Sequence, residues 1–301
     1  MIDVRYINKN FGDICAVKNI SLRIESNQVF GLLGTNGAGK STLLRIICDI
    51  LYPDSGTVMI DGRVIHDNPE VKKNIFFIPD DAYFFPGATP ETMMSYYSGY
   101  YENFDKNRCK YLINSFNLGI TRTIDTYSKG MKRLLSIILG ISAGTPYLIC
   151  DETFDGLDPV VRQGVKSLLA RDMDKRGLTS VISSHNLREM EDICDHIGLL
   201  HKGGVILSED VSTISDKIQK VQAVFMDDAK RIETENKLDI KSVNTVGHIY
   251  TYIINATRED AERIFSEASA IYYEILDLTM EEVFISETEA AGYDIRNFIK
   301  E

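Results

Sequence analysis

One octapeptide, Gly34-Thr35-Asn36-Gly37-Ala38-Gly39-Lys40-Ser41, limits what this chain can fold into more than any other feature. An apolar run, Val29 to Leu33, precedes it, and the stretch from Ser41 to Leu51 carries apolar residues at helical spacing. The pattern predicts a strand, a glycine-rich loop and a helix in that order. Glycine lets the backbone come close to a ligand, and the amide groups of the loop and of the helix N-terminus then point at it. We therefore expect a phosphate-binding loop.

The octapeptide matches the pattern GxxxxGK(S/T) in the strand, loop and helix context that the pattern requires. In such a loop Lys40 supplies positive charge for the β- and γ-phosphates, and Ser41 offers its hydroxyl to Mg²⁺. Ligand contacts are expected from Gly34, Thr35, Asn36, Gly37, Ala38, Gly39, Lys40, Ser41 and Thr42. A glycine-rich turn that binds nothing is the alternative, and the match of both pattern and context argues against it.

Two acidic residues follow a second buried-strand signal, Tyr147 to Cys150. A phosphate-binding loop needs an acidic group at the end of a neighbouring strand to hold the metal shell, and Asp151 is the candidate. Glu152 comes next. Successive side chains of a strand point to opposite sides, so the Glu152 carboxylate would point away from Asp151. There it could act as the general base for a water molecule that attacks the bound phosphate. The alternative is a strand end that merely meets solvent.

Strand and helix signals alternate up to about residue 215, which is typical of a parallel sheet in an α/β fold. A third strand signal, Leu178 to Ser183, lies just before His185. Between about residues 86 and 145 the pattern is mainly helical and predicts an inserted subdomain. We therefore predict one domain over residues 1–215 and a small α+β accessory domain over residues 221–301.

Composition limits the classes of function. No run reaches the roughly 18 uncharged apolar residues of a membrane span, and the N-terminus lacks the apolar core of a signal peptide, so we expect a cytoplasmic chain. The chain has 33 Lys and Arg against 44 Asp and Glu, and the resulting formal charge of −11 argues against nucleic acid as a partner. The five cysteines stand singly, which indicates neither a disulfide framework nor a zinc site.

The order of these motifs resembles that of the ABC ATPase family, a P-loop NTPase fold with an inserted helical subdomain, over residues 1–215. Tyr127 to Met131, shortly before the acidic strand, is similar to the family signature LSGGQ, of which Ser128 and Gly130 match. The resemblance implies that this segment caps the γ-phosphate of ATP bound to the opposite protomer of a dimer. An ordinary turn that begins a helix is the alternative.

Three further residues acquire roles through the same resemblance. Asp158 ends the segment Asp155-Gly156-Leu157-Asp158, which resembles the family's D-loop where it meets the partner protomer, and His185 corresponds to the switch histidine that contacts the γ-phosphate. Phe11 corresponds to the aromatic residue that stacks on adenine, a contact worth about 1–3 kcal/mol if base-stacking energies apply. A structural histidine and a core phenylalanine are the alternatives.

Two positions depart from the family pattern. Asp80 stands where the family usually has glutamine, at the end of the strand before the helical insertion. Its carboxylate can bind water or join the Mg²⁺ shell, but it cannot donate a hydrogen bond. Thr153 and Phe154 replace the proline and threonine that usually follow the catalytic glutamate, and we assign no consequence to that change.

The resemblance implies an ATP-hydrolysing subunit of an ABC transporter that uses Mg²⁺. A permease on a separate chain would hold it at the inner face of the cell membrane, as a homodimer or as a heterodimer with a second ABC ATPase. The signature form YSKGM and the extra C-terminal domain resemble ATPases of ABC-2 type exporters of drugs, peptides or antibiotics. A soluble ABC-type ATPase acting in translation or on DNA is the alternative. The single phosphate-binding loop, the lack of heptads and the negative charge argue against it.

The helix predicted to begin after Thr89 carries Met93, Tyr96, Tyr97 and Tyr100 at helical spacing. From the family position we expect this aromatic face near the cleft that receives the permease's coupling helix. Packing within the helical subdomain is the alternative.

Overall fold

The structure, a computed structural model, describes residues 1–187, 190, 193–268 and 270–290. The chain divides into two compact units, Met1–Val205 and Ile206–Glu301. The strand β10 (Gly204–Asp210) spans this division. The boundary expected from the sequence, near residue 215, falls within the helix α8 (Val211–Lys217), and this boundary stays a prediction. In the described part of the chain, no helix is both long enough and apolar enough to cross a membrane.

Within the described ranges, the N-terminal unit is built on the parallel part of a six-stranded sheet. This part has the order β9 (His196–His201), β3 (Val29–Gly34), β8 (Thr179–Ser184), β7 (Tyr147–Asp151) and β6 (Ile75–Ile78). Every residue of β3, β7 and β8 is buried, as expected of strands covered on both faces. Asp151 pairs in register with Ser183, and Leu33 with Ser184. The carboxyl ends of the three strands therefore meet at one edge, and so do the loops that follow them.

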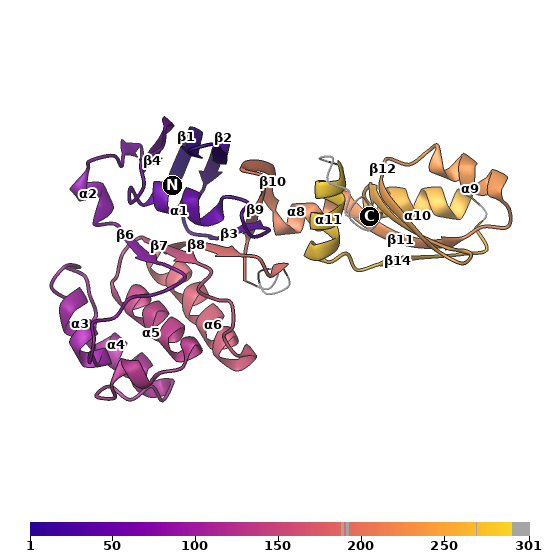
Figure 1. Ribbon diagram of the computed structural model, residues 1–301. Coiled ribbons are helices and arrows are strands. Elements are labelled where there is room, and N and C mark those ends of the chain that lie inside the picture. Colours follow the sequence, from indigo (N-terminus) through magenta and orange to yellow (C-terminus); the bar gives the residue numbers. More distant parts are fainter. Residues whose placement is uncertain (188–189, 191–192, 269, 291–301) are drawn as a thin grey trace. The chain divides into compact units, whose positions relative to one another are not determined.

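An antiparallel sheet contains β2 (Ile14–Ile24), β1 (Ile2–Phe11), β4 (Ser55–Ile60) and β5 (Arg63–Val64) in this order. Figure 1 shows α1 (Lys40–Ile47) between this sheet and the parallel one. Leu43, Leu44 and Ile47 of α1 are buried in one core cluster with apolar residues of β1, β2 and β3. The helix after the glycine-rich loop is thus fixed by apolar contacts on both sides. The short helix α2 (Pro69–Lys72) precedes β6.

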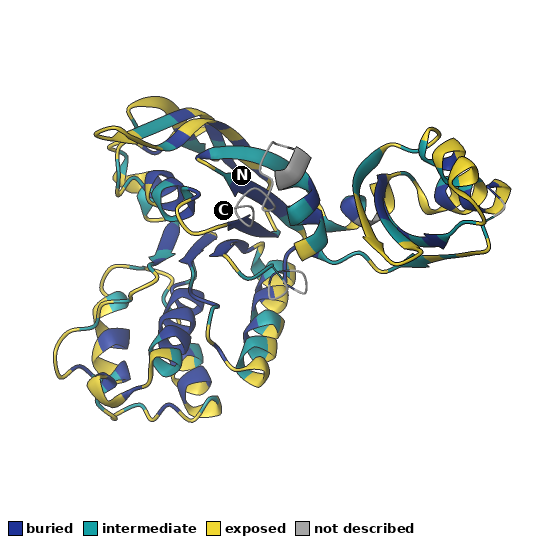
Figure 2. Ribbon diagram, turned by 45° about the vertical axis from the view of Figure 1, so that its right-hand side comes forward, coloured by how far each residue is buried: buried dark blue, intermediate teal, exposed yellow. Residues whose placement is uncertain are grey.

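The region between β6 and β7 is helical. It contains α3 (Pro90–Tyr97), α4 (Lys106–Ser115), a 3-10 turn (Ile124–Thr126) and α5 (Lys129–Ser142), and α6 (Pro159–Arg176) follows β7. A side chain accepts a hydrogen bond from a free amide at the start of each α-helix, which stabilises such a helix by about 1 kcal/mol. These caps are Thr89, Asp105, Ser128 and Asp158. Most of α5 is buried (Figure 2).

The C-terminal unit contains β11 (Ile218–Val224), α9 (Asp228–Glu235), β12 (Ile240–Val246), β13 (Ile249–Asn255), α10 (Arg258–Glu267) and β14 (Tyr272–Leu276). The strands pair antiparallel in the order β12-β13-β11-β14, as in ferredoxin-like folds. Val221, Tyr252 and Phe265 are fully buried in its core. The helix α11 (Met280–Ala290) ends the described chain. The predicted α/β class is confirmed.

Candidate nucleotide-binding site

The loop between β3 and α1 depends on glycine at two positions. Gly34 has a φ of 154° and Gly39 a φ of 103°, which residues with side chains rarely adopt. A Cβ atom at Gly39 would lie 2.4 Å from the carbonyl oxygen of Ala16, and one at Gly34 would lie 2.5 Å from that of Leu200. Only glycine fits at either position, so the spacing of these glycines follows from the backbone path of the loop.

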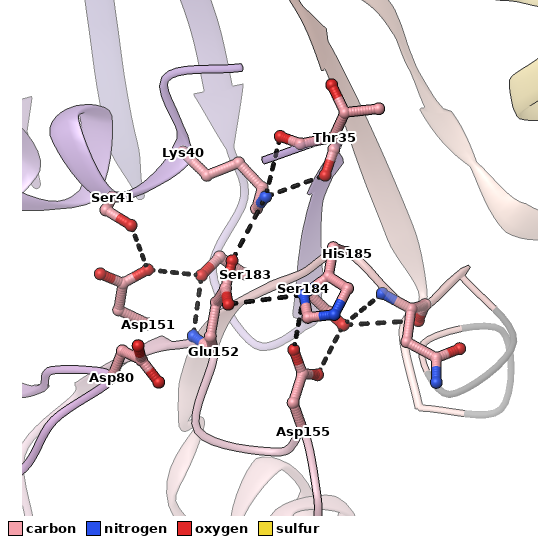
Figure 3. Close-up of polar contacts among 12 residues, drawn as sticks. Thr35, Lys40, Ser41, Asp80, Asp151, Glu152, Asp155, Ser183, Ser184 and His185 are labelled. Atoms are coloured by element: carbon pink, nitrogen blue, oxygen red, sulfur yellow. Dashed lines mark hydrogen bonds and ion pairs between the residues drawn. The ribbon is translucent and has the colours of Figure 1, made fainter. Parts of the chain in front are cut away.

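Lys40 is the first residue of α1 and is only 4% exposed. Its Nζ donates hydrogen bonds to the carbonyl oxygens of Gly34, at 2.8 Å, and of Thr35, at 3.2 Å. The same atom lies 3.4 Å from Glu152 Oε1 (Figure 3). A buried ammonium group held over a loop in this way fits a phosphate ligand, because the phosphate would bring the negative charge that burial demands.

Asp151 ends β7 and is completely buried. Its Oδ1 accepts hydrogen bonds from the hydroxyls of Ser41, at 2.9 Å, and of Ser183, at 2.8 Å. Its Oδ2 is buried and has no hydrogen-bond partner among the described residues. A buried carboxylate oxygen without a partner next to a serine hydroxyl fits a magnesium ion, which prefers oxygen ligands. The sequence analysis predicted Ser41 and Asp151 as a pair but missed Ser183.

Glu152 lies directly after β7 and has a φ of 47°. This left-handed conformation turns the chain, and the amide of Glu152 donates a hydrogen bond to Ser183 Oγ at 3.0 Å. The carboxylate lies between Lys40 Nζ and His185 Nδ1, each at 3.4 Å from one of its oxygens. Backbone strain of this kind clusters at functional sites. The structure thus brings together five of the predicted residues, Lys40, Ser41, Asp151, Glu152 and His185 (Figure 3).

His185 follows β8 and is half-exposed. Its Nδ1 lies 3.0 Å from Asp155 Oδ2, and Ser184 Oγ donates a hydrogen bond to Asp155 Oδ1 at 2.8 Å. Burial raises the pKa of the Asp155 carboxyl, although the hydrogen bond from Ser184 and the neighbouring His185 act in the other direction. The sequence analysis placed Asp155 in the D-loop segment and named His185, but it did not predict that Asp155 contacts His185 and Ser184. The serines directly before the histidine were the signal that could have indicated these contacts.

Asp80 follows β6 and pairs with Arg133 of α5, whose Nη2 lies 2.6 Å from Asp80 Oδ1. Arg133 Nη1 donates a second hydrogen bond to the main-chain carbonyl of Asp155. Arg133 was missed in the sequence analysis because no motif includes it. The part of Asp80 in a metal shell stays a prediction.

Phe11 ends β1 and is 48% exposed, which excludes the alternative of a core phenylalanine. Lys9 Nζ lies 5.6 Å from the centre of its ring. Phe11 pairs with Ile14 across the hairpin, and Ile14 is 70% exposed. About half of Phe11 is therefore accessible to solvent.

Ser128 and Asp158 are exposed at the N-termini of α5 and α6. Ser128 Oγ accepts a hydrogen bond from the amide of Met131 at 3.2 Å, and Asp158 Oδ1 accepts one from the amide of Val161 at 2.9 Å. Gly130 lies in the first turn of α5. Across the described ranges, no hydrogen bond or ion pair links Ser128 or Asp158 to Lys40, Asp151 or Glu152.

Comparisons with known proteins identify the family. Residues 17–155 match the ABC transporter family. The chain is 31% identical, over 95% of its own length and 97% of the relative's, to the ABC transporter ATP-binding protein YtrB of Bacillus subtilis. It is 28% identical to the bacitracin transport ATP-binding protein BcrA of Enterococcus faecalis, over 76% of each chain. The soluble ATPase alternative finds no support in these relatives.

The fold is that of solved ABC cassettes. The dimeric structure of a post-hydrolysis state of the ATP-binding cassette MJ0796 bound to ADP and Pi superposes with a TM-score of 0.63. The match covers 70% of this chain and 99% of that one at 22% identity, and it supports the fold alone. The sequence relatives and the phosphate-binding loop, taken together with this fold, establish the family of the chain. The chain belongs to the ABC transporter ATP-binding proteins, as an ABC ATPase that binds ATP.

Proposed function

We propose that this chain hydrolyses ATP at the cluster around Lys40 and Glu152 and thereby powers export of a compound through a permease on a separate chain. One observation carries the proposal. Lys40, Ser41, Asp151 and Glu152 converge where the parallel strands β3 and β7 end, with the buried Lys40 ammonium 3.4 Å from the Glu152 carboxylate. Ligands of open α/β sheets bind at this edge.

In the proposed reaction, the loop amides and Lys40 bind the β- and γ-phosphates and orient them for in-line attack by water. Ser41 and Asp151 would hold Mg²⁺, which when bound neutralises phosphate charge. Glu152 accepts the proton of the attacking water. Lys40 Nζ lies 3.4 Å from Glu152 Oε1 and donates a hydrogen bond to the carbonyl of Gly34, so a bound phosphate would compete for the ammonium and release the carboxylate for this task.

His185 would donate a hydrogen bond from Nε2 to the γ-phosphate. Its Nδ1 lies beside the Asp155 carboxylate, and this contact fixes the orientation of the ring. Asp155 and Ser184 are therefore proposed to position the histidine. Phe11, at the exposed end of β1, would stack on the adenine ring.

Ser128, Gly130 and Asp158 are proposed to act on ATP bound to a second cassette. The exposure of Ser128 and Asp158 at two helix N-termini supports this part, since the amides there suit an anionic ligand and the two side chains are separate from the chain's own Lys40 cluster. The partner would be a second copy of this chain or a second ABC ATPase.

The permease is proposed to bind at an aromatic cavity of about 420 Å³. This binding would keep the chain at the cytoplasmic face of the membrane. Tyr83, Phe85 and Tyr96 line it and are 72%, 38% and 40% exposed. Met93 also lines the cavity but is only 2% exposed, and so belongs to the core. Tyr97 packs on Phe76, with ring centres 5.1 Å apart. Exposed aromatic side chains are typical anchors of protein interfaces.

The relative named for bacitracin transport supports a peptide antibiotic as the exported compound. The test is co-purification with the permease encoded by the neighbouring reading frame, followed by reconstitution in lipid vesicles. We expect ATP-dependent movement of an antimicrobial peptide that is lost when Glu152→Gln replaces the wild-type chain. A chain that co-purifies with ribosomes or DNA, and not with the permease, would contradict the proposal.

A further inference from the structure

We propose that Arg133 is a positioning residue for ATP hydrolysis, which holds the loop after β6 and the loop after β7 on the helix that begins at Ser128. The proposal rests on the hydrolytic site proposed above. Arg133 lies in the second turn of α5 and is 8% exposed. Its guanidinium binds two segments at once, the Asp80 carboxylate at 2.6 Å and the main-chain carbonyl of Asp155.

The partners of Arg133 explain why this contact concerns the reaction. Asp155 contacts His185 through one carboxylate oxygen and Ser184 through the other. Glu152 lies in the same loop, and its carboxylate contacts the same histidine. A displacement of the Asp155 carbonyl would therefore disturb two groups. One is Glu152, the proposed base, and the other is His185, which is proposed to donate a hydrogen bond to the γ-phosphate.

The contacts at this position suit an arginine paired with an aspartate better than other residues. A guanidinium is always charged and presents donors in a planar fork, so it can bind a carboxylate and a carbonyl in one geometry, which a lysine cannot. Arg133 is buried and needs a negative partner, whereas the Asp80 side chain is 50% exposed. Glutamine, the residue that the family usually has at this position, would bring no charge. Asp80 thus departs from the family pattern where a buried guanidinium needs a carboxylate.

The position of Arg133 on α5 gives the contact a second consequence. The first turn of the same helix carries Ser128, which is proposed to act on ATP bound to the partner cassette. One rigid helix therefore joins the loop that carries the chain's own base to the residue that serves the opposite site. Loss of the Arg133 contacts should slow the chemical step and leave ATP binding intact.

The test is a double-mutant cycle on the full chain, in complex with its permease, with Arg133→Gln, Asp80→Asn and both together. Because the phosphate-binding loop is untouched, we expect KM for ATP to stay within about twofold in all three variants. We expect kcat to fall about 10- to 100-fold in each single variant, as for misplaced catalytic groups. The double variant should be no worse than either single one, since both changes remove one contact.

Two controls separate the outcomes. Arg108→Gln removes another partly buried Arg–Asp pair, in which Arg108 Nη2 lies 2.5 Å from Asp172 Oδ1 and links α4 to α6. It should lower the melting temperature and leave kcat unchanged below that temperature. An Arg133→Gln enzyme with wild-type kcat, a loss of kcat that Arg108→Gln reproduces, or additive losses in the double variant would overturn the positioning role. Wild-type turnover in Glu152→Gln would instead refute the hydrolytic site itself.

Discussion

At the scale of single residues, the site depends on Glu152 in a conformation that costs about 1–3 kcal/mol for a residue with a side chain. Ser183 holds it there, because its hydroxyl accepts from the amide of Glu152 and donates to the Asp151 carboxylate. One buried hydroxyl thus sets the distance between the proposed base and the proposed metal ligand.

Ser183→Ala should therefore lower kcat about tenfold or more, since leaving such buried groups unpaired costs about 1–3 kcal/mol. Ser180→Ala is the matched control. Ser180 is buried on the same strand, and its Oγ has no hydrogen-bond partner among the described residues. Steady-state kinetics on both variants would decide the matter, and equal kcat values for the two would argue against a positioning role for Ser183.

Phe11 offers a direct test of adenine stacking. Phe11→Ala should weaken ATP binding by about 1–3 kcal/mol, measured by calorimetry. Ile14→Ala, which alters an exposed residue of the same hairpin, should leave the affinity unchanged. The chain has no tryptophan, so Phe11→Trp would place its only indole at the site and should report ATP by a change in fluorescence. Equal affinities for the wild type and Phe11→Ala would place the adenine elsewhere.

Local spacing explains which of these residues could be predicted. Lys40, Ser41, Asp151 and Glu152 follow strands, and the ends of parallel strands meet at one edge of the sheet, so their proximity was predictable.

The residues that hold these groups in place make contacts that are distant in sequence, and they lie outside any motif. Arg133 and Asp80 are 53 residues apart, and Ser183 and Asp151 are 32 apart. Such contacts depend on how helices and strands pack, which periodicity does not reveal.

At the scale of elements, the helix α5 places Ser128 in two roles. Its hydroxyl caps the helix, and it is proposed to bind the partner's γ-phosphate. The aromatic face predicted after Thr89 is also divided. Met93 of α3 is core, whereas Tyr100 was wrongly predicted to continue this helix: α3 ends at Tyr97, and Tyr100 lies beyond it and is 66% exposed. Periodicity predicted a stripe of residues, but only packing determines which part of the stripe is buried.

Two substitutions separate the roles of Ser128. Ser128→Ala should lower stability by about 1 kcal/mol, because the cap is lost. Ser128→Asp should keep the melting temperature, since aspartate also caps helices and suits the helix N-terminus. It should nevertheless abolish turnover, because its charge repels phosphate. Thermal melts and ATPase assays measure both effects, and full activity in Ser128→Asp would show that the serine is only a cap.

At the scale of the whole molecule, every residue assigned to the nucleotide lies in the unit Met1–Val205. A chain cut after Ser215 keeps β10 whole. It should therefore fold and bind ATP, which circular dichroism melts and calorimetry would check. An insoluble or nucleotide-blind product would mean that residues beyond the cut are needed for folding, and that the predicted domain boundary is wrong.

The central claim is that ATP is hydrolysed at Glu152 between two cassettes. Glu152→Gln keeps the shape of the side chain but removes the proton acceptor, so turnover should fall about 10²- to 10⁴-fold. ATP binding should persist because Lys40 and Asp151 are untouched. ATP that is not hydrolysed would then hold two chains together.

The most direct measurement is size-exclusion chromatography with light scattering on Glu152→Gln, in ATP and in ADP. We predict a dimer in ATP and a monomer in ADP, with the dimer lost when Ser128→Arg is added. A Glu152→Gln chain that stays monomeric in ATP would contradict a homodimeric site and require a second ABC ATPase as partner. A dimer that forms regardless of nucleotide and of Ser128 would contradict the shared site altogether.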